Sequence, residues 1–279
     1  MAATSFPPIR ACIFDMDGLL INSEDIIGQA TNQLLEKHAR PHLTQSMRAR
    51  LMGVAGSTSS DMFHDWAKLP ITREAWAVEL GEQMRRHFQD CEPLPGAEAL
   101  LFNLRHARTL LPDSGEHGKI ELALASTTKT PSYKLKTSRP ATKQLLSFFQ
   151  PERRVLGDDP RLPQGRSKPA PDIYLLALES LNSTISSTSP ILPKECLVFE
   201  DSVAGVEAAR RAEMRVVWVP HPDLALEYQA RQKDVLAGRT DLFDIGDDWQ
   251  LGQVDDGWAE RIASLEHFDY TKYGLHLPS

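Results

Sequence analysis

Five short apolar runs recur along the chain, and each of them ends in a polar or turn-forming residue. Near-continuous apolar runs of this length are typical of strands buried in a parallel sheet. Helical patterns lie between the runs, including one over 203–212 for which Ser202 is a predicted N-cap. The alternation predicts the α/β class, with a parallel sheet and helices on both of its faces. The predicted strands span residues 9–14, 120–125, 153–156, 196–199 and 215–219.

The interval 19–92 has a different pattern. Strand-like runs disappear there, and apolar residues recur at helical spacing, as at Ile26, Ala30 and Leu34. We therefore expect an all-helical domain inserted after the first strand. The predicted boundaries give an α/β core over 1–18 and 93–279 and a helical insert over 19–92.

Gly96 is the predicted turn at which the chain re-enters the core, because a helical pattern follows it directly. Three other segments, 107–119, 182–193 and 224–258, have the composition of loops and turns. We interpret these three segments as surface elaborations of the core.

Length and composition fit this organisation. The chain has 279 residues, enough for one core with a smaller insert, and 41% hydrophobic with 25% charged residues is typical of folded domains. The net charge of −7 offers no basic field for a polyanion, so we expect no nucleic-acid partner.

The cellular setting is predicted from absences in the sequence. Cys12, Cys91 and Cys196 lie far apart and form no metal-binding or disulfide pattern, which indicates a reducing compartment. No run of 18 apolar residues and no leader pattern is visible. We therefore expect a cytoplasmic protein without a membrane partner, as a monomer or a weak homo-oligomer.

Polar residues gather at the ends of the predicted strands. Ligands of open parallel sheets bind beyond the carboxyl ends of the strands, so these residues are the candidates for a site. The loop before the helix at 171–181 adds a lysine. The candidate residues are Asp15 and Asp17 after the first strand, Ser126 and Thr127 after the second, Lys168 in the loop, and Glu200 and Asp201 after the fourth strand.

This set of residues predicts a phosphate site. Clustered carboxylates repel one another unless a cation lies between them, and oxygen donors without His or Cys favour Mg²⁺. A Mg²⁺ ion beside Lys168 and Ser126 would receive a phosphate dianion and stabilise charge on its oxygens. The predicted substrate is a phosphate ester.

Asp15 and Asp17 can divide the work of phosphoryl transfer. Asp15 could attack phosphorus to give an aspartyl-phosphate, while Asp17 protonates the leaving oxygen and later deprotonates water. Gly18 would let the chain turn sharply after them.

Other charged groups have ordinary interpretations. The basic residues Lys129, Lys134, Lys136 and Arg139 are predicted to form a solvated helix face. A further set in the insert is predicted to be solvated as well, although it could supply a second phosphate pocket. That set comprises Arg48, Arg50, Arg85 and Arg86.

Four segments in order, FDMDGLL, ALAST, SKPAPDIY and LVFEDSVAGVEAA, resemble the motifs of the haloacid dehalogenase-like phosphohydrolases. The resemblance covers 9–220 and implies a Rossmann-like core, with 19–92 as a helical cap of the C1 type. It implies Asp15 as nucleophile, Asp17 as general acid/base, Ser126 with Thr127 and Lys168 as phosphate ligands, and Asp15, the Asp17 carbonyl, Glu200 and Asp201 around Mg²⁺.

Within this family, further segments such as KTSR at 136–139 and VLGDDP at 155–160 are similar to the pseudouridine-5'-monophosphatase group. Two positions depart from that group: Ser167 and Glu213 stand where glycines are usual. Glu213 would be strained if its backbone has a positive φ.

Several functions remain open from the sequence. One is a Mg²⁺-dependent phosphatase for a small phosphomonoester such as pseudouridine 5'-phosphate or another nucleotide. Alternatives are a sugar or polyol phosphate phosphatase and a phosphomutase, and a third class is a non-catalytic phosphometabolite sensor.

Overall fold

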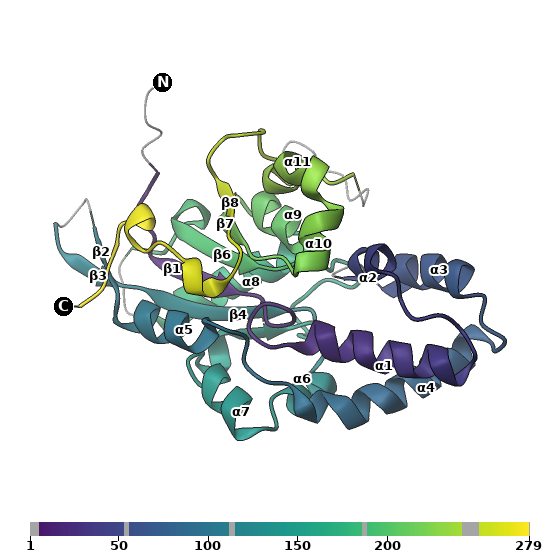
Figure 1. Cartoon of the computed structure of the whole chain (residues 1–279). Coiled ribbons are helices and arrows are strands. Elements are labelled where there is room, and N and C mark those ends of the chain that lie inside the picture. Colours follow the sequence, from purple (N-terminus) through teal and green to yellow (C-terminus); the bar gives the residue numbers. More distant parts are fainter. Residues whose placement is uncertain (1–5, 53–55, 112–114, 186–188, 242–250, 279) are drawn as a thin grey trace.

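A six-stranded parallel sheet forms the centre of the protein (Figure 1). The computed structural model describes residues 6–52, 56–111, 115–185, 189–241 and 251–278. The strands lie in the order β5-β4-β1-β6-β7-β8. Their bounds are Ala11–Phe14 for β1, Glu121–Ser126 for β4, Arg154–Leu156 for β5, Cys196–Glu200 for β6, Arg215–Trp218 for β7 and Ala259–Arg261 for β8.

All five predicted strands are confirmed within one or two residues at their ends. The edge strand β8 is not predicted by the sequence, because its three residues Ala259, Glu260 and Arg261 include only one apolar side chain. Pairing with β7, which brings Val216 beside Ala259, defines this strand.

Alternate residues of each strand face opposite sides of the sheet, and two apolar layers result. On one face, Phe14 and Phe199 stack with their ring centroids 4.6 Å apart, and the helices α5 (Ala97–His106) and α7 (Pro140–Leu146) add leucines. On the other face, Ile13 and Val198 pack with α8 (Asp172–Thr184) and α9 (Val203–Arg211). The predicted arrangement with helices on both faces is confirmed.

The chain between β1 and α5 is helical throughout its described elements, and Figure 1 shows these helices to one side of the sheet. Leu34, Leu35, Phe63, Ala67 and Trp76 form an apolar cluster of their own among them. The helices are α1 (Ser23–Lys37), α2 (Gln45–Leu51), α3 (Gly56–Ala67), α4 (Arg73–His87) and the 3₁₀ turn η1 (Phe88–Asp90).

The two connections between these helices and the core lie side by side. Leu94 donates its backbone N–H to the carbonyl of Leu20 at 2.9 Å, and Asn22 donates to the carbonyl of Glu92 at 3.1 Å. The chain therefore leaves and re-enters the core through one hydrogen-bonded pair of segments. The domain limits at 18/19 and 92/93 stay a prediction.

The segment 107–119, expected to be a loop, contains two strands, so that expectation is wrong. β2 (Arg108–Leu110) and β3 (His117–Lys119) pair with each other, and β2 also pairs with β9 (Leu275–His276) near the carboxyl terminus. Because β9 lies far along the sequence, local composition does not reveal this small antiparallel sheet.

The segment 224–258, expected to consist of loops and turns, also contains helices, so that expectation is wrong. α10 (Pro222–Glu227) and α11 (Gln232–Ala237) bury Leu224 and Val235 against the α8/α9 face of the sheet. Residues 242–250 lie outside the described residues. In the third segment, α8 continues to Thr184, residues 186–188 lie outside the described residues, and the 3₁₀ turn η3 (Pro193–Glu195) precedes β6.

Three local predictions are confirmed by the backbone. Gly96 has a φ of 82° directly before α5, and Ser202 caps α9 by accepting a hydrogen bond from the N–H of Gly205. Glu213 has a φ of 57° after α9, a conformation that costs a non-glycine residue about 1 kcal/mol. Among the described residues, no helix has the length and apolar character needed to span a membrane.

Candidate active site

Lys168 lies where three neighbouring strands end. Its Nζ donates to Asp15 Oδ1 at 2.6 Å, to Glu200 Oε1 at 2.6 Å and to the carbonyl of Ala125 at 3.2 Å. Asp15 follows β1, Ala125 belongs to β4 and Glu200 ends β6. The side chains of Lys168, Asp15 and Glu200 are at most 7% exposed. A buried cation is thus held between two buried carboxylates.

Glu200 uses both of its oxygens within the protein. Besides Lys168, Oε1 accepts a hydrogen bond from the hydroxyl of Tyr174 at 2.7 Å, and Oε2 accepts from the backbone N–H and the hydroxyl of Ser202 at 2.8 and 3.0 Å. Gly205 in α9 lies against this carboxylate, since a Cβ there would be 1.7 Å from Oε1. Glu200 is therefore fixed in position and orients Lys168.

The carboxylate of Asp17 has a different set of partners. Oδ1 accepts from Ser23 at 2.6 Å and from the Lys136 ammonium at 2.5 Å, while Oδ2 accepts from Thr128 at 2.5 Å and Ser126 at 3.3 Å. Burial opposes the ionised form, but the charge of Lys136 and these hydrogen bonds outweigh it and lower the pKa of Asp17. Asp17 is an ionised, fully hydrogen-bonded carboxylate.

The two residues expected after β4 differ in placement. Ser126 is buried and its Oγ also accepts a hydrogen bond from the N–H of Thr128 at 3.2 Å. The side chain of Thr127 is exposed. The backbone carbonyl oxygen of Thr127 lies against Gly157, and a Cβ on Gly157 would be 2.0 Å from this oxygen. The structure therefore brings Ser126 and Thr128 to Asp17, while Thr127 contributes its backbone to the turn.

Asp201 comes close to the backbone of Gly18. A Cβ on Gly18 would lie 2.2 Å from Asp201 Oδ2 and 2.9 Å from Cγ of Glu24, and Gly18 has a φ of 72°. Only a glycine leaves room for the Asp201 carboxylate at this point. The Trp218 indole donates to the carbonyl of Asp201 at 2.8 Å and fixes the chain behind it.

Negative charge is in excess around Asp201. Burial, followed by the charges of Glu200, Asp15 and Glu24, raises the pKa of Asp201 well above its usual range. Burial likewise raises the pKa of Asp15 and that of Glu24 to about 7 each. A cation near these carboxylates would relieve the repulsion and favour their ionised forms.

The donors fit Mg²⁺ better than a metal caged entirely by side chains. Among the described residues, no three His, Cys, Asp or Glu side chains converge into a metal cage. Mg²⁺ commonly takes one or two carboxylates and keeps several waters, and the carboxylates of Asp15 and Asp201 with the backbone carbonyl of Asp17 would supply such oxygens. The carboxylates of Glu200 and Asp17 are already held by protein donors.

The prediction that the basic stretch is a solvated helix face is wrong for Lys136. This residue ends α6 (Thr130–Lys136), is 4% exposed and contacts Asp17, whereas Lys134 on the same helix is exposed. A lysine in a charged helix gives no local signal of burial, so sequence reasoning misses it. Sequence reasoning also misses Thr128, which directly follows the Ser-Thr pair.

The arginines of the inserted helices do not converge on one pocket. Arg48 forms ion pairs with Asp25 of α1 and with Asp223 of α10, the latter at 3.2 Å, and is only partly exposed, so its prediction as solvated is wrong. Arg50 pairs with Glu227 at 2.9 Å. Arg85 and Arg86 are exposed on α4. Arg48 and Arg50 thus connect α2 to α10.

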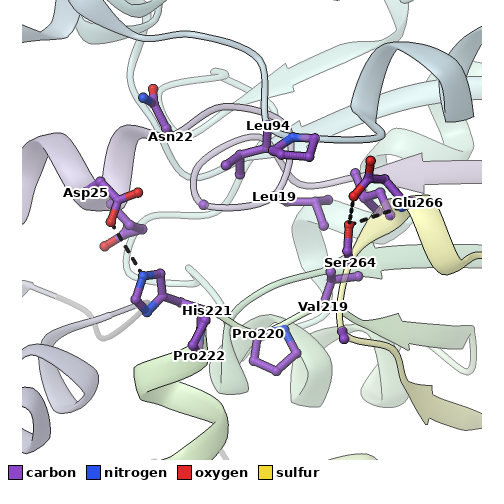
Figure 2. Close-up of a pocket in the computed structure, with 15 residues that line it drawn as sticks. Leu19, Asn22, Asp25, Leu94, Val219, Pro220, His221, Pro222, Ser264 and Glu266 are labelled. Carbon is purple, nitrogen blue, oxygen red and sulfur yellow. Dashed lines mark hydrogen bonds and ion pairs between the residues drawn. The ribbon is translucent and has the colours of Figure 1, made fainter.

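A cavity of about 320 Å³ opens beside the carboxylates, and Gly18 and Glu24 are part of its lining (Figure 2). Figure 2 shows Asp25 and His221 facing each other on one side, 3.5 Å apart at their nearest polar atoms. Further walls come from Leu19 after β1, from Leu94 and Pro95 before α5, and from the segments after β7 and β8. The cavity therefore adjoins Gly18 and Glu24, the two residues beside the Asp201 carboxylate.

Comparison with known proteins identifies the family of this chain. The haloacid dehalogenase-like hydrolase family matches residues 9–213, and the chain belongs to this family. The site lies within the matched part of the chain. The site contains a carboxylate pair, a buried lysine and hydroxyl groups at one edge of the sheet.

Individual relatives are phosphatases by name. A Saccharomyces cerevisiae protein named a probable pseudouridine-5'-phosphatase is 33% identical over 96% of this chain and 98% of that protein. An Arabidopsis thaliana (DL)-glycerol-3-phosphatase is 30% identical over 89% of this chain and 94% of that protein. The fold matches a haloacid dehalogenase hydrolase from Entamoeba histolytica with a TM-score of 0.62, 16% identity and coverage of 95% of this chain and 97% of that chain. The chain is therefore a hydrolase of the phosphatase type.

Proposed function

We propose that the protein is a Mg²⁺-dependent phosphomonoesterase that works through an aspartyl-phosphate on Asp15. The contact of Lys168 with Asp15 carries this proposal, because it fixes a positive charge beside a buried carboxylate at the edge of the sheet. Lys168, Ser126 and the backbone of the turn at Thr127 would bind the phosphate. Glu200 is assigned to holding Lys168 rather than to direct metal contact.

The reaction takes two balanced steps. An oxygen of Asp15 attacks phosphorus, the bond from phosphorus to the ester oxygen breaks, and Asp17 gives a proton to the leaving alcohol. Water then attacks the phosphoryl group, Asp17 takes up its proton, and the departure of phosphate restores Asp15. The phosphate dianion that enters beside Asp17 adds negative charge, which raises the pKa of Asp17 toward the acid form that the first step needs.

Asp15, the carbonyl of Asp17 and Asp201 would hold Mg²⁺. When bound, the ion supplies positive charge that stabilises the phosphoryl oxygens. The ammonium of Lys168 would balance the negative charge of Asp15 and of the phosphate. The hydroxyl of Ser126 would donate a hydrogen bond to the phosphate. The helices of 19–92 are proposed to act as a cap, since the connecting segments pass directly beside Gly18 and Asp17.

For the substrate, we propose a nucleotide, with pseudouridine 5'-phosphate first. The relative named a probable pseudouridine-5'-phosphatase supports this choice, as do the segments KTSR and VLGDDP. A polyol or sugar phosphate is the second candidate, supported by the glycerol-3-phosphatase relative. The separated arginines of the inserted helices do not favour a phosphomutase, which needs a second phosphate site.

The test is release of inorganic phosphate from a panel of nucleotide, sugar, polyol and aryl phosphates, with Mg²⁺ and with EDTA. We expect Mg²⁺-dependent release that Asp15→Asn abolishes, and the best ester identifies the substrate class. Transfer of phosphate to a second hydroxyl without release would support the mutase alternative. A folded protein that binds phosphate esters and turns over none of them would support the sensor.

A further inference from the structure

The ammonium of Lys136 has more partners than the single carboxylate of a simple ion pair. Its Nζ lies 2.5 Å from Asp17 Oδ1 and 3.0 Å from the hydroxyl of Thr128, and 4.5 Å from the centre of the Phe88 ring. Lysine is seldom buried, because its ammonium loses hydration that only good partners replace. Here an anion, a hydroxyl and an aromatic ring surround it.

Lys136 completes the hydrogen-bonding capacity of Asp17. An ionised carboxylate offers about four acceptor positions, and Ser23, Ser126, Thr128 and Lys136 supply four donors to the two oxygens of Asp17. The three hydroxyls can rotate and serve other acceptors. The ammonium is the one charged donor of the four, so it contributes most to the direction in which the carboxylate points.

Lys136 is itself held in place from two sides. It ends α6, whose residue Tyr133 packs against the core, and the Phe88 ring comes from η1 at the end of the inserted helices. These contacts fix the position of the Lys136 ammonium. The hydrogen bond to this ammonium in turn restricts the orientation of the Asp17 carboxylate.

We propose that Lys136 is a positioning residue for Asp17: it aims the Asp17 carboxylate at the oxygen that leaves with the alcohol. This inference rests on the proposed phosphatase function. It makes Lys136 act through Asp17 and distinguishes it from Lys168, whose contact is with Asp15.

The test uses leaving groups that need different amounts of protonation. Lys136→Met keeps a long side chain and removes the charge. Kinetics are measured with an alkyl phosphate, which needs an acid for its leaving oxygen, and with an aryl phosphate such as p-nitrophenyl phosphate, which needs little help. Because general acid catalysis contributes about 10²- to 10⁴-fold, we expect kcat for the alkyl ester to fall at least about tenfold, with less than about a threefold loss for the aryl ester and KM nearly unchanged.

Lys134→Met is the matched control, since Lys134 lies on the same helix and is exposed. It removes the same charge from the protein without touching the site, and both esters should react as with the parent. Lys136→Arg restores a cation and should recover part of the alkyl activity. In an Asp17→Asn background, Lys136→Met should have no further effect on the alkyl ester, because residue 17 can no longer give a proton to the leaving oxygen.

Other results overturn the inference. Equal losses of kcat for both esters, together with a raised KM, would indicate that Lys136 binds the phosphate. Equal losses that follow a drop in thermal stability, without recovery by arginine, would make it structural. If the parent shows no turnover that depends on Asp15, the proposed function fails; if that turnover is present and Lys136→Met behaves as the parent, only the role of Lys136 fails.

Discussion

The ammonium of Lys168 and the carboxylate of Asp15 lie 2.6 Å apart in a site that excludes most solvent. The lysine comes from the loop before α8 and the aspartate from the end of β1, so their contact depends on the assembled sheet. In the proposed mechanism, this cation would stabilise the negative charge that builds up on the attacked phosphoryl group. We therefore expect a substitution at this contact to change both activity and stability.

Replacing Lys168 by methionine should reduce both activity and stability. Loss of a preorganised charge of this kind lowers kcat by about 10²- to 10³-fold. Asp15 and Glu200 would also remain buried without their cation, which costs about 3 kcal/mol of the free energy of unfolding. Phosphate release and urea unfolding in EDTA measure the two effects. A Lys168→Met variant that keeps full activity would contradict the proposed role of Lys168 in catalysis.

Gly205→Ala should damage the site although it changes no polar group. A Cβ at this position would lie 1.7 Å from Oε1 of Glu200, so the carboxylate must move and Lys168 with it. Alanine in a helix interior otherwise stabilises by about 0.5–1 kcal/mol relative to glycine. We expect lower stability and at least about a tenfold loss of kcat, since misplacing a catalytic group by about 1 Å can cost about 10²-fold.

Gly81→Ala is the control for this helix substitution. Gly81 lies in α4, and a Cβ there would make an ordinary contact with Arg85 at 3.6 Å. Gly81→Ala should raise the free energy of unfolding and leave phosphate release unchanged. Equal behaviour of the two variants would contradict the role given to Glu200.

Gly18→Ala should weaken Mg²⁺ binding, because its Cβ would displace the Asp201 carboxylate. Gly165 offers a matched comparison: its φ of 77° is similar, but nothing lies within 4 Å of the added Cβ. Both variants carry the same backbone strain, and only one disturbs Asp201. Thermal unfolding at increasing Mg²⁺ concentration should show an apparent Kd raised at least about tenfold for Gly18→Ala alone, by the linkage of binding to stability. Equal Mg²⁺ responses would place the ion elsewhere.

Glu24 gives the unfolding free energy a defined pH dependence. Burial, followed by the charge of Asp17, raises the pKa of Glu24 to about 7 from an ordinary value of 4.5. The folded protein therefore holds this proton more tightly than the unfolded chain, and the stabilisation present below about pH 4.5 is lost as the pH rises toward 7. Glu24→Gln cannot ionise, so in EDTA it should match the parent near pH 4.5 and exceed it by about 1 kcal/mol above pH 7, a value reduced for the partial exposure of the side chain.

Urea unfolding at both pH values measures this difference, and Glu82→Gln on the exposed face of α4 is the control. The control should show no pH-dependent gain. A Glu24→Gln variant that is no more stable than the parent above pH 7 would show that ionised Glu24 does not destabilise the folded protein.

The sequence predicts the central sheet well because its strands are buried on both faces. Runs such as 196–199 contain only apolar residues, and the polar or turn-forming residue that follows each run marks the strand's carboxyl end. Since parallel strands end at one edge, Asp15, Ser126 and Glu200 could be placed together without knowing the strand order. The contacts that these residues make needed the structure.

The short elements depend on partners that are distant in the sequence. β2 pairs with β9, which lies more than 160 residues further along the chain, and β8 owes its position to β7. Lys136 illustrates the same limit for the site. Lys168 lies in a loop whose sequence pattern can be recognised. Lys136 is buried because α6, η1 and Asp17 come together in the fold, and the sequence around Lys136 gives no sign of this burial.

Detection of the covalent intermediate tests the central claim most directly. Asp17→Asn mixed with an aryl phosphate should form the aspartyl-phosphate, because an aryl leaving group needs little acid, and should hydrolyse it slowly, because water lacks its base. Acid quenching and mass spectrometry of peptides should then find one phosphoryl group on Asp15, removable by hydroxylamine. Release of the aryl alcohol without a phosphoryl group on Asp15 would contradict the account.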